Sequence, residues 1–455
     1  MKNRARFIWL LLLLVHIPRF PRAQVYGNEW YDPTQPYIRI GVLDRAWYRV
    51  DFFLLEWYFR EAGVSVGAIP ASRYQIWSDG KQIPIRVVDG KDNRLDPGDY
   101  IEFMGGPADG KIDRDMYIGG GEQPQSFRSL ISDTAYYFIT FTARAPWLRY
   151  EHVAPDPVSA QLRPWYLHEE LELEQSTYNR GTPQRVMDKD LFPSEYSPTE
   201  GWMGPVFGYG TGGYQTDHAF VFDTRGFNAA GPAPLLMYFF SGTSAYAGRI
   251  DHRLQVKLTP NSRGPRTILD TSFRGHSGYN KTVKLFPSDL GSLFTELRLS
   301  PVNVTGIPYS YYQAAYGLLR YPRFTHLNGA NAIAFKVPSS IGAQHMSWAN
   351  PGPGLRFPVV VNPELGLRVS GRRFGNDSIV FDLPVSPHLT EWVLMDSLQY
   401  RLVSMDRDSV YKPVLAELPD FSTHINNAEY IIVTHPSLLG SETDAYLRYR
   451  EGSFS

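Results

Sequence analysis

Short runs in which apolar and polar residues alternate recur along most of the chain, and turn residues separate them. Strict alternation is typical of a half-buried β-strand, and Gly, Pro, Asn and Asp between such runs are typical of turns. The pattern therefore predicts a mainly β protein.

Residues 24–150 are predicted to form an N-terminal β-rich domain. The stretch "YIRIGVLDRAWYRV" contains two strands, and a short helix follows that Asp51 can cap and Gly63 can close. Asp79-Gly80 joins two alternating runs, and Asp-Gly is a favoured turn of two-residue β-hairpins. Two further strands are expected, at 100–103 and 135–143.

Residues 151–425 are predicted to form a β-sandwich domain with jelly-roll-like connections. Strand-length runs bounded by Pro, Gly, Asn or Ser follow one another here without long segments of helical period. These runs are "HEELELEQ", "HAFVFDTRGF", "LLMYFFSGTS", "DHRLQVKLTP", "TVKLFP", "FTELRLSP", "NAIAFKVP" and "SIVFDLP". The stretch "GIPYSYYQAAYGLLRYPR" at 306–323 is interpreted as a linker with one helical turn.

The final segment, 426–455, departs from this β pattern. Tyr430–Thr434 is a continuous apolar run, typical of a strand buried on both faces of a parallel sheet. Ser441–Asp444 offers an N-cap and an acidic first turn for a helix. One strand and one helix cannot bury a core of their own. We therefore expect the segment to be the incomplete start of an α/β domain that continues beyond Ser455.

The N-terminus has the pattern of a signal peptide over residues 1–23. Basic residues precede the apolar run Phe7–Val15, which is too short to span a bilayer, and cleavage is expected after Ala23. The protein is therefore expected to be exported in soluble form, and an uncleaved anchor is the alternative.

Composition narrows the function classes. The net charge is −1, so nothing in the charge balance points to nucleic acid or to an electrostatically held membrane surface. The 29 Tyr, 26 Phe and 10 Trp favour strands, and the 39 Gly and 35 Pro favour turns. The chain contains no Cys, which excludes disulfides, thiolate metal ligands, a lipid-anchoring cysteine and a cysteine nucleophile within these 455 residues.

The stretch "GYGTGG", with glycines at 208, 210 and 213, formally matches a dinucleotide-binding fingerprint. That chemistry needs a helix N-terminus directly after the glycines to hold the pyrophosphate. Here "YQTDHAFVFDT" follows and alternates as a strand. We interpret the motif as a glycine loop between two strands.

Acidic and histidine residues give no metal site that can be assigned. The acidic stretch at 89–102 lacks the ligand rhythm of an EF-hand, so turn residues are the preferred interpretation over a calcium site. The histidines, including His168 and His435, show no H-E-x-x-H spacing for zinc.

Three further features leave alternatives open. A Ser-His-Asp arrangement is compatible with the sequence, although no G-x-S-x-G elbow occurs. The tyrosines of Tyr309–Tyr312 suit core packing or stacking on sugar rings. Asn280, Asn303 and Asn376 fit the N-x-[ST] glycosylation pattern. No catalytic, cofactor-binding or metal-binding residue is assigned from the sequence, and no cofactor is expected.

Both ends of the chain resemble a known family. "YIRIGVLDRAWYRV", "YQIWSDGKQIPI" and "DPGDYIEFMGGPADGKIDRDMY" resemble the N-terminal region of the PorU-like sortases of the type IX secretion system. "NNAEYIIVTHPSLLGSETDAYLRYRE" is similar to the opening strand and helix of their gingipain-type, caspase-like cysteine peptidase domain. The resemblance runs from about residue 37 to residue 451, and its central β-region matches in style only.

The resemblance implies a role at the bacterial cell surface. Such sortases use a Cys nucleophile with a His partner to remove C-terminal sorting signals from cargo proteins and attach the cargo to the surface. It implies as partners the missing C-terminal peptidase domain, a PorV-like outer-membrane β-barrel and the signal domains of cargo, but no nucleic acid. His435 matches a strand end and not the catalytic His, so no catalytic residue carries over to this chain.

Two other functions remain open on the sequence alone. The chain would also suit a secreted β-sandwich module that binds glycan or protein without chemistry. An independent enzyme, such as a glycoside hydrolase, stays open because paired carboxylates cannot be located without a structure.

Overall fold

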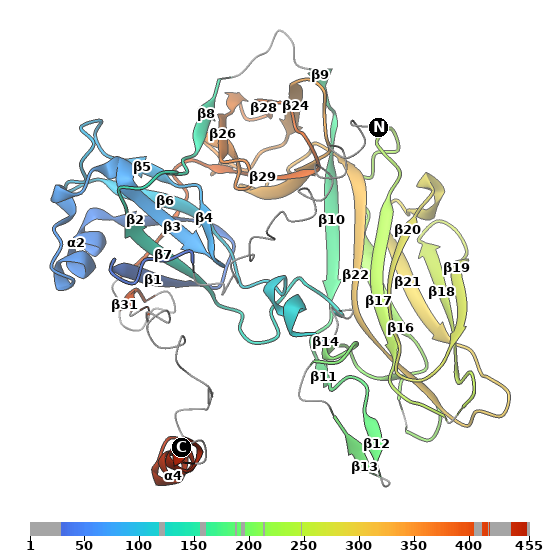
Figure 1. Ribbon diagram of the computed structural model, residues 1–455. Helices are drawn as coiled ribbons and strands as arrows, with labels where there is room; N and C mark the ends of the chain where they lie inside the picture. Colours follow the sequence, from blue (N-terminus) through green and yellow to red (C-terminus); the bar gives the residue numbers. More distant parts are fainter. Residues whose placement is uncertain are drawn as a thin grey trace, which may run out of the picture. The chain divides into compact units, whose positions relative to one another are not determined.

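The computed structural model describes residues 29–117, 123–154, 161–186, 189–192, 196–212, 214–246, 248–404, 412–416, 418 and 438–452 (Figure 1). The described chain is mainly β, as predicted, with two α-helices among these residues, α2 (Phe52–Glu61) and α4 (Ser441–Gly452). It divides into a unit over Tyr37–Leu415 and a second unit made of Met1–Pro36 and Ala416–Ser455. None of the described helices is long and apolar enough to cross a membrane.

Two sheets and helix α2 build the N-terminal domain. The first sheet has the order β31 (Val414–Ala416), β1 (Tyr37–Val42), β7 (Ala135–Phe141), β3 (Tyr74–Ser78) and β4 (Lys81–Ile83). The second has the order β30 (Arg401–Leu402), β2 (Ala46–Asp51), β6 (Tyr100–Gly105) and β5 (Arg86–Val88). One apolar core joins both sheets to α2, and Val403 and Leu415 from the far end of the chain belong to it.

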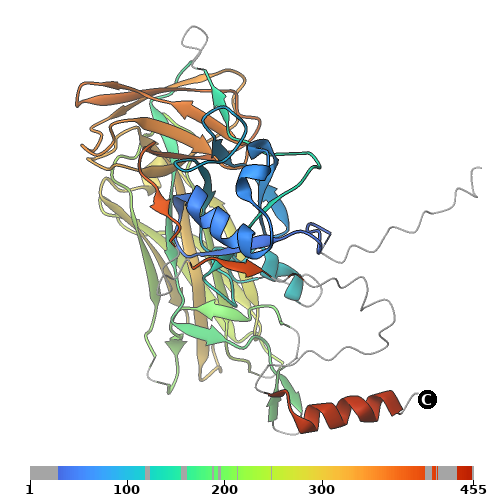
Figure 2. The same cartoon turned by 90° about the vertical axis from the view of Figure 1, so that its left-hand side faces the viewer.

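Local sequence signals set the bounds of α2 and of the first hairpin. The Asp51 carboxylate accepts a hydrogen bond from the Leu54 N–H at 2.9 Å, and Gly63 turns the chain after the helix with φ +78°. Asp79 and Gly80 both have positive φ between β3 and β4, as a tight hairpin turn requires. These predictions are confirmed. Figure 2 shows α2 lying against the sheets whose core it shares.

A ten-stranded sheet is the central element of the remaining chain. Its path is β20 (Gly278–Lys284), β17 (Leu235–Gly242), β22 (Ser310–Phe324), β10 (Trp165–Leu173), β23 (Ile333–Val337), β29 (Thr390–Asp396), β25 (Pro358–Asn362), β26 (Leu367–Ser370) and β8 (Glu151–Val153), and β15 (Phe207–Tyr209) pairs with β22. Two ribbons, β11 (Thr177–Asn179) with β14 (Gly201–Met203) and β12 (Gln184–Val186) with β13 (Lys189–Leu191), complete this part of the chain.

Two four-stranded sheets cover one half each of the ten-stranded sheet and form two β-sandwiches. The first has the order β16 (His218–Asp223), β21 (Phe294–Pro301), β18 (His252–Pro260) and β19 (Arg266–Phe273). The second has the order β27 (Arg372–Phe374), β28 (Ser378–Leu383), β24 (Gln344–Ala349) and β9 (Gln161–Leu162). Phe222 and Tyr238 lie in the core of the first sandwich, and Trp348 and Trp392 lie in that of the second.

The stretch at 306–323 is not a linker, and that prediction was wrong. It forms most of β22, a strand of 15 residues that pairs with both β10 and β17. Most of its residues are buried, so the sequence lacks the alternation of apolar and polar residues that would have identified a strand. Gly317 is needed at its centre, since a Cβ there would lie 2.8 Å from the Phe222 ring.

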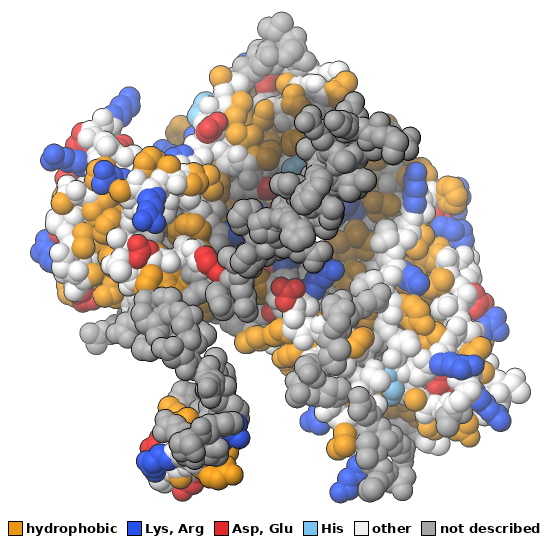
Figure 3. Space-filling model, in the orientation of Figure 1, with side chains coloured by type: hydrophobic (Ala, Val, Ile, Leu, Met, Phe, Trp, Pro, Cys, Tyr) orange, Lys and Arg blue, Asp and Glu red, His pale blue; other side chains and the backbone are white. Residues whose placement is uncertain are grey.

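Trp47 of β2 packs the N-terminal domain onto the ten-stranded sheet. It shares a small apolar core with Val359, Val361, Val393 and Met395 on the face opposite the second sandwich. The surface seen in Figure 3 carries basic and acidic side chains interspersed, without a large patch of either sign. This mixture agrees with the net charge of −1.

Helix α4 confirms the helix predicted at the chain's end, with Glu442 and Asp444 in its first turn. The predicted signal peptide, 1–23, and the predicted strand at 430–434 lie outside the described residues. The predicted domain limits at 150 and 425 stay predictions.

Candidate functional site

A serine–histidine pair lies at one end of the first sandwich. The Ser310 Oγ lies 2.7 Å from the His252 Nδ1, and the His252 Nε2 lies 2.9 Å from the Ser244 carbonyl oxygen. Because the carbonyl accepts from Nε2–H, Nδ1 is the acceptor of the Ser310 hydroxyl proton. Asp251 directly precedes His252 in the chain, and its Oδ1 lies 3.8 Å from the His252 Nε2.

Burial excludes catalysis by this pair in the described conformation. Ser310 and His252 are both completely buried, and the His252 ring stacks on Phe273 with centroids 4.8 Å apart. Burial lowers the pKa of His252, so its ring is held neutral. A nucleophile must reach its substrate, so this network is structural and ties β18 to β22.

The glycine stretch at 208–213 lies between two strands, as predicted, and its glycines allow close packing. It connects β15 to β16, and Gly208 and Gly210 have φ of +146° and +138°. A Cβ on Gly208 would lie 2.0 Å from the Ser310 carbonyl oxygen, a contact that no other residue type could make. Gly213 lies outside the described residues.

The acidic stretch at 89–102 is divided between turns and a buried ion cluster. Asp89 and Asp92 accept hydrogen bonds from backbone N–H groups two residues further on, which is the usual role of Asp in tight bends. Glu102 is completely buried and bonds to Arg49 at 2.6 and 2.9 Å and to Arg86 at 2.6 Å. Across the described part of the chain, no group of three or more His, Asp or Glu side chains is arranged to hold a metal ion.

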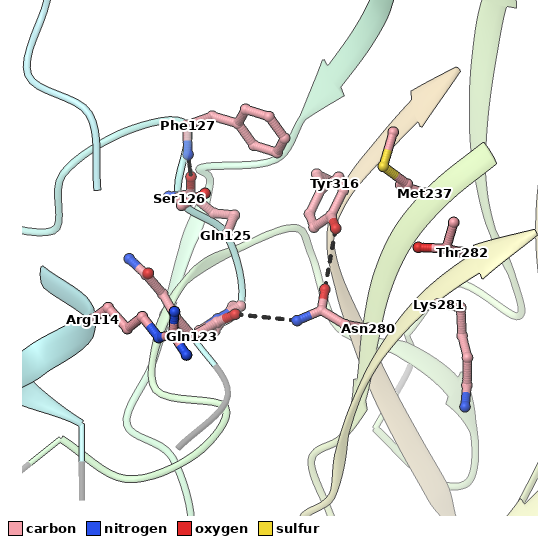
Figure 4. Close-up of a pocket in the computed structure, with 11 residues that line it drawn as sticks. Arg114, Gln123, Gln125, Ser126, Phe127, Met237, Asn280, Lys281, Thr282 and Tyr316 are labelled. Atoms are coloured by element: carbon pink, nitrogen blue, oxygen red, sulfur yellow. Dashed lines mark hydrogen bonds between the residues drawn. The ribbon is translucent and has the colours of Figure 1, made fainter. Parts of the chain in front are cut away.

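A groove of about 440 Å³ lies where the segment after η3 (Ile112–Met116) meets the outer face of the ten-stranded sheet (Figure 4). Its walls carry two cations, three amides and two aromatic rings: Arg114, Lys281, Gln123, Gln125, Asn280, Phe127 and Tyr316. The strands β20 and β22 supply one wall, and the loop that precedes β7 supplies the other.

Side-chain contacts hold the groove in shape. The Tyr316 hydroxyl donates to the Asn280 Oδ1 at 3.1 Å, and the Asn280 amide donates to the Gln123 carbonyl oxygen at 3.5 Å (Figure 4). The Phe127 ring meets the Tyr316 ring edge-on at 5.1 Å. The described residues that line this groove offer groups for binding and include neither a histidine nor a carboxylate that could act as a general base.

A row of four tyrosine rings lies beside the glycine loop, and three of them are on loops while Tyr311 belongs to β22. Tyr309 and Tyr311 stack at 5.6 Å, Tyr246 meets Tyr309 edge-on at 6.1 Å, and Tyr214 meets Tyr311 edge-on at 5.0 Å. Tyr214 and Tyr246 are exposed, whereas the neighbouring Tyr312 is completely buried. Tyr312 therefore packs in the core, whereas Tyr309 and Tyr311 are half-buried, and stacking on sugar rings stays a prediction.

The remaining sequence candidates are scattered. Asn280 lies in the groove, whereas Asn303 and Asn376 lie exposed on other loops. The His168 Nε2 pairs with the Glu170 carboxylate at 2.9 Å, and His435 lies outside the described residues. Apart from Asn280, no sequence pattern marks the groove, because its walls come from segments far apart in the chain.

Comparisons with known proteins yield structural likeness only. No family model and no curated protein matches the chain. Among solved structures it is similar to dimeric latent PorU from Porphyromonas gingivalis, with a TM-score of 0.49 and 12% identity, over 84% of this chain and 33% of that one. A structure of the infectious bursal disease virus Gx strain gives a TM-score of 0.16 at 6% identity, over 52% of this chain and 61% of that chain. The chain thus spans about a third of the length of the PorU chain, and likeness at these levels carries no conclusion about chemistry.

Proposed function

We propose that these domains are the non-catalytic N-terminal part of a sortase-like cysteine peptidase of the type IX secretion system. One observation supports this most directly. The three N-terminal stretches that resemble the family form β1 and β2, β3 and β4, and β6 with η3. They are the framework of a single domain, so the resemblance follows a folding unit and not a set of unrelated strands.

In this proposal the described domains position a peptidase domain and do no chemistry. The absence of Cys from all 455 residues and the burial of the Ser310–His252 pair agree with a supporting role. The partners proposed are the peptidase domain, a PorV-like outer-membrane β-barrel and the C-terminal signal domains of cargo. The site of action proposed is the periplasm or the outer-membrane cell surface, reached by export.

The return of the chain to its first domain gives this role a physical basis. Strands β30 and β31 add to the two N-terminal sheets at β2 and β1, and the segment that resembles a peptidase domain follows β31 in the chain. A domain attached there would be tethered to the N-terminal domain and not to the sandwiches.

The test is made on the native protein in the cell envelope. Its intact mass is measured, peptides are mapped past Ser455, and cargo proteins are examined for retained C-terminal signals after deletion of the gene. The proposal expects a mass well above 51.8 kDa, extra peptides that carry a His and a Cys, and unprocessed cargo in the deletion strain. A mature protein that ends at Ser455, with normal cargo processing after deletion, would refute it.

A binding module without chemistry is the second candidate, and the tyrosine row favours it. Tyrosines offer rigid contact area with hydroxyl groups, and Gly, Ser and Thr residues fill the loops around them, a composition typical of protein-binding loops on β-sandwiches. Under this candidate Tyr214→Ala with Tyr246→Ala would abolish surface retention of the protein while cargo processing stays normal. Under the sortase proposal, deletion of the gene leaves cargo unprocessed. Cargo processing after deletion therefore distinguishes the sortase proposal from the binding module.

A further inference from the structure

A crevice of about 740 Å³ lies where the two sandwiches meet along the ten-stranded sheet. The turn after β16 in the first sandwich forms one side, and β24 of the second sandwich forms the other. The end of β22 and the residue just before β10 form its floor. Concave sites between packed units are where small ligands usually bind.

Basic and hydrogen-bonding side chains converge on this crevice. Arg225 comes from the turn, Arg323 from β22 and His326 from the loop that follows, and Ser347 faces them from β24. The Asn328 N–H donates to the His326 Nδ1 at 3.1 Å, so the ring proton of neutral His326 sits on Nε2, where it is available as a donor. No Asp or Glu is among the described residues that line the crevice.

The two arginines are not equivalent. Arg225 is held by Asp223 through contacts of 2.7 to 3.1 Å, so most of its charge is balanced. No carboxylate of the described residues lies within 4.0 Å of Arg323, and the Asp223 carboxylate acts on its charge only from farther away. Its side chain lies over Gly226, whose φ is +77°, and a Cβ there would lie 3.3 Å from the Arg323 Nε. The glycine therefore leaves room for Arg323 at the mouth of the crevice.

One wall of the crevice is apolar. Phe324 is 51% exposed although it belongs to β22, and Pro164 and Ala349 continue the apolar surface. The volume far exceeds that of an inorganic anion. A ligand that fills the site must therefore combine an anionic group with an apolar body.

We propose that this crevice binds an organic oxyanion, a carboxylate or phosphate monoester on an aromatic or apolar body. The guanidinium of Arg323 pairs with the oxyanion, because its planar donors match such oxygens. His326 and Ser347 add hydrogen bonds, and Phe324 packs against the body. This site is independent of the proposed sortase role.

Isothermal titration of the full chain at low ionic strength tests the site. The probes are N-acetyl-phenylalanine, phenyl phosphate and the uncharged N-acetyl-phenylalaninamide. We expect at least one anion to bind and the amide not to bind, and the tighter anion identifies the class of oxyanion. Arg323→Gln should weaken that binding about tenfold or more, because a charge-assisted pair is lost.

Two variants control the result. Arg263→Gln removes an exposed arginine on the β18–β19 turn and should leave binding unchanged. Ala349→Phe fills the crevice without removing a charge and should abolish binding, which keeps the test valid if Arg323→Gln folds poorly. Equal binding of the amide, equal losses in Arg263→Gln and Arg323→Gln, or no binding of either anion would each overturn the proposal.

Discussion

Replacing Glu102 by Gln should destabilise the N-terminal domain far more than an exposed carboxylate would. Glu102 is completely buried on β6 and receives three short bonds from Arg49 and Arg86. Arg49 lies between the rings of Tyr100 and Tyr400, at 3.7 and 3.5 Å from their centroids. The variant keeps the shape of the side chain and removes the one negative charge that both arginines share.

The loss of stability in Glu102→Gln depends on the two arginine charges that remain without a carboxylate partner. Removal of one partner from a buried ion pair costs about 3–5 kcal/mol, because the other charge stays buried without compensation. The Arg49 side chain is 15% exposed and that of Arg86 is 33% exposed, so water relieves part of the penalty. We therefore expect the low end, about 3 kcal/mol. Burial acts to lower the pKa of Arg86, yet the bond to Glu102 outweighs it and the pKa is raised, which agrees with this coupling.

Hydrogen exchange read by mass spectrometry is the suitable assay, since it reports each domain separately. A loss of about 3 kcal/mol should speed exchange in β2 and β6 about 100-fold or more, while β17 and β22 keep their protection. Glu391→Gln is the matched control, because its pair with Arg45 is partly exposed and such pairs contribute about 0–1 kcal/mol. Equal, small effects of the two variants would refute the reasoning.

Three further predictions concern single positions. Asp51→Ala should cost about 1 kcal/mol through loss of the α2 cap and speed amide exchange in that helix, whereas Asp51→Asn should change exchange little. Gly208→Ala should expose the amides of β15, because the added Cβ would collide with the Ser310 carbonyl, and unchanged protection would contradict this. Burial lowers the pKa of His252 from its ordinary 6.5, so the unfolded chain takes up the proton first and stability falls as pH drops below about 6.5. Thermal unfolding from pH 8 to 5 should show this slope, and His252→Gln should reduce it.

The sequence predicted elements whose signals are local. Asp51, Gly63 and Asp79-Gly80 act on their own neighbours in the chain, so the cap, the helix end and the hairpin could all be placed. Strand β22 was missed, because burial on both faces removes the alternation that identifies a strand.

Long-range contacts explain what else the sequence did not show. In the sequence, Glu102 looks like the other acidic residues of a turn region. Its buried ion pair could not be predicted, because its partner Arg49 is 53 residues away in the chain. Strand β30 has two residues and β31 has three, which is too short for an alternation of apolar and polar residues to be recognised. The residues that line the groove and the crevice come from segments far apart in the chain. No sequence motif predicts that these segments come together.

The return of β30 and β31 to the N-terminal domain also sets an order of folding. A chain is synthesised from its N-terminus, yet the two sheets of the first domain gain their outer strands only when residues 401–416 arrive. Pairings of such long sequence separation form slowly, and until then β1 and β2 present open edges. The strands of the sandwiches all lie within 151–396, so their pairings do not need residues 401–416 and can form first. The domain that begins the chain would then be the last to close, and a chaperone that shields open strand edges would be most needed there.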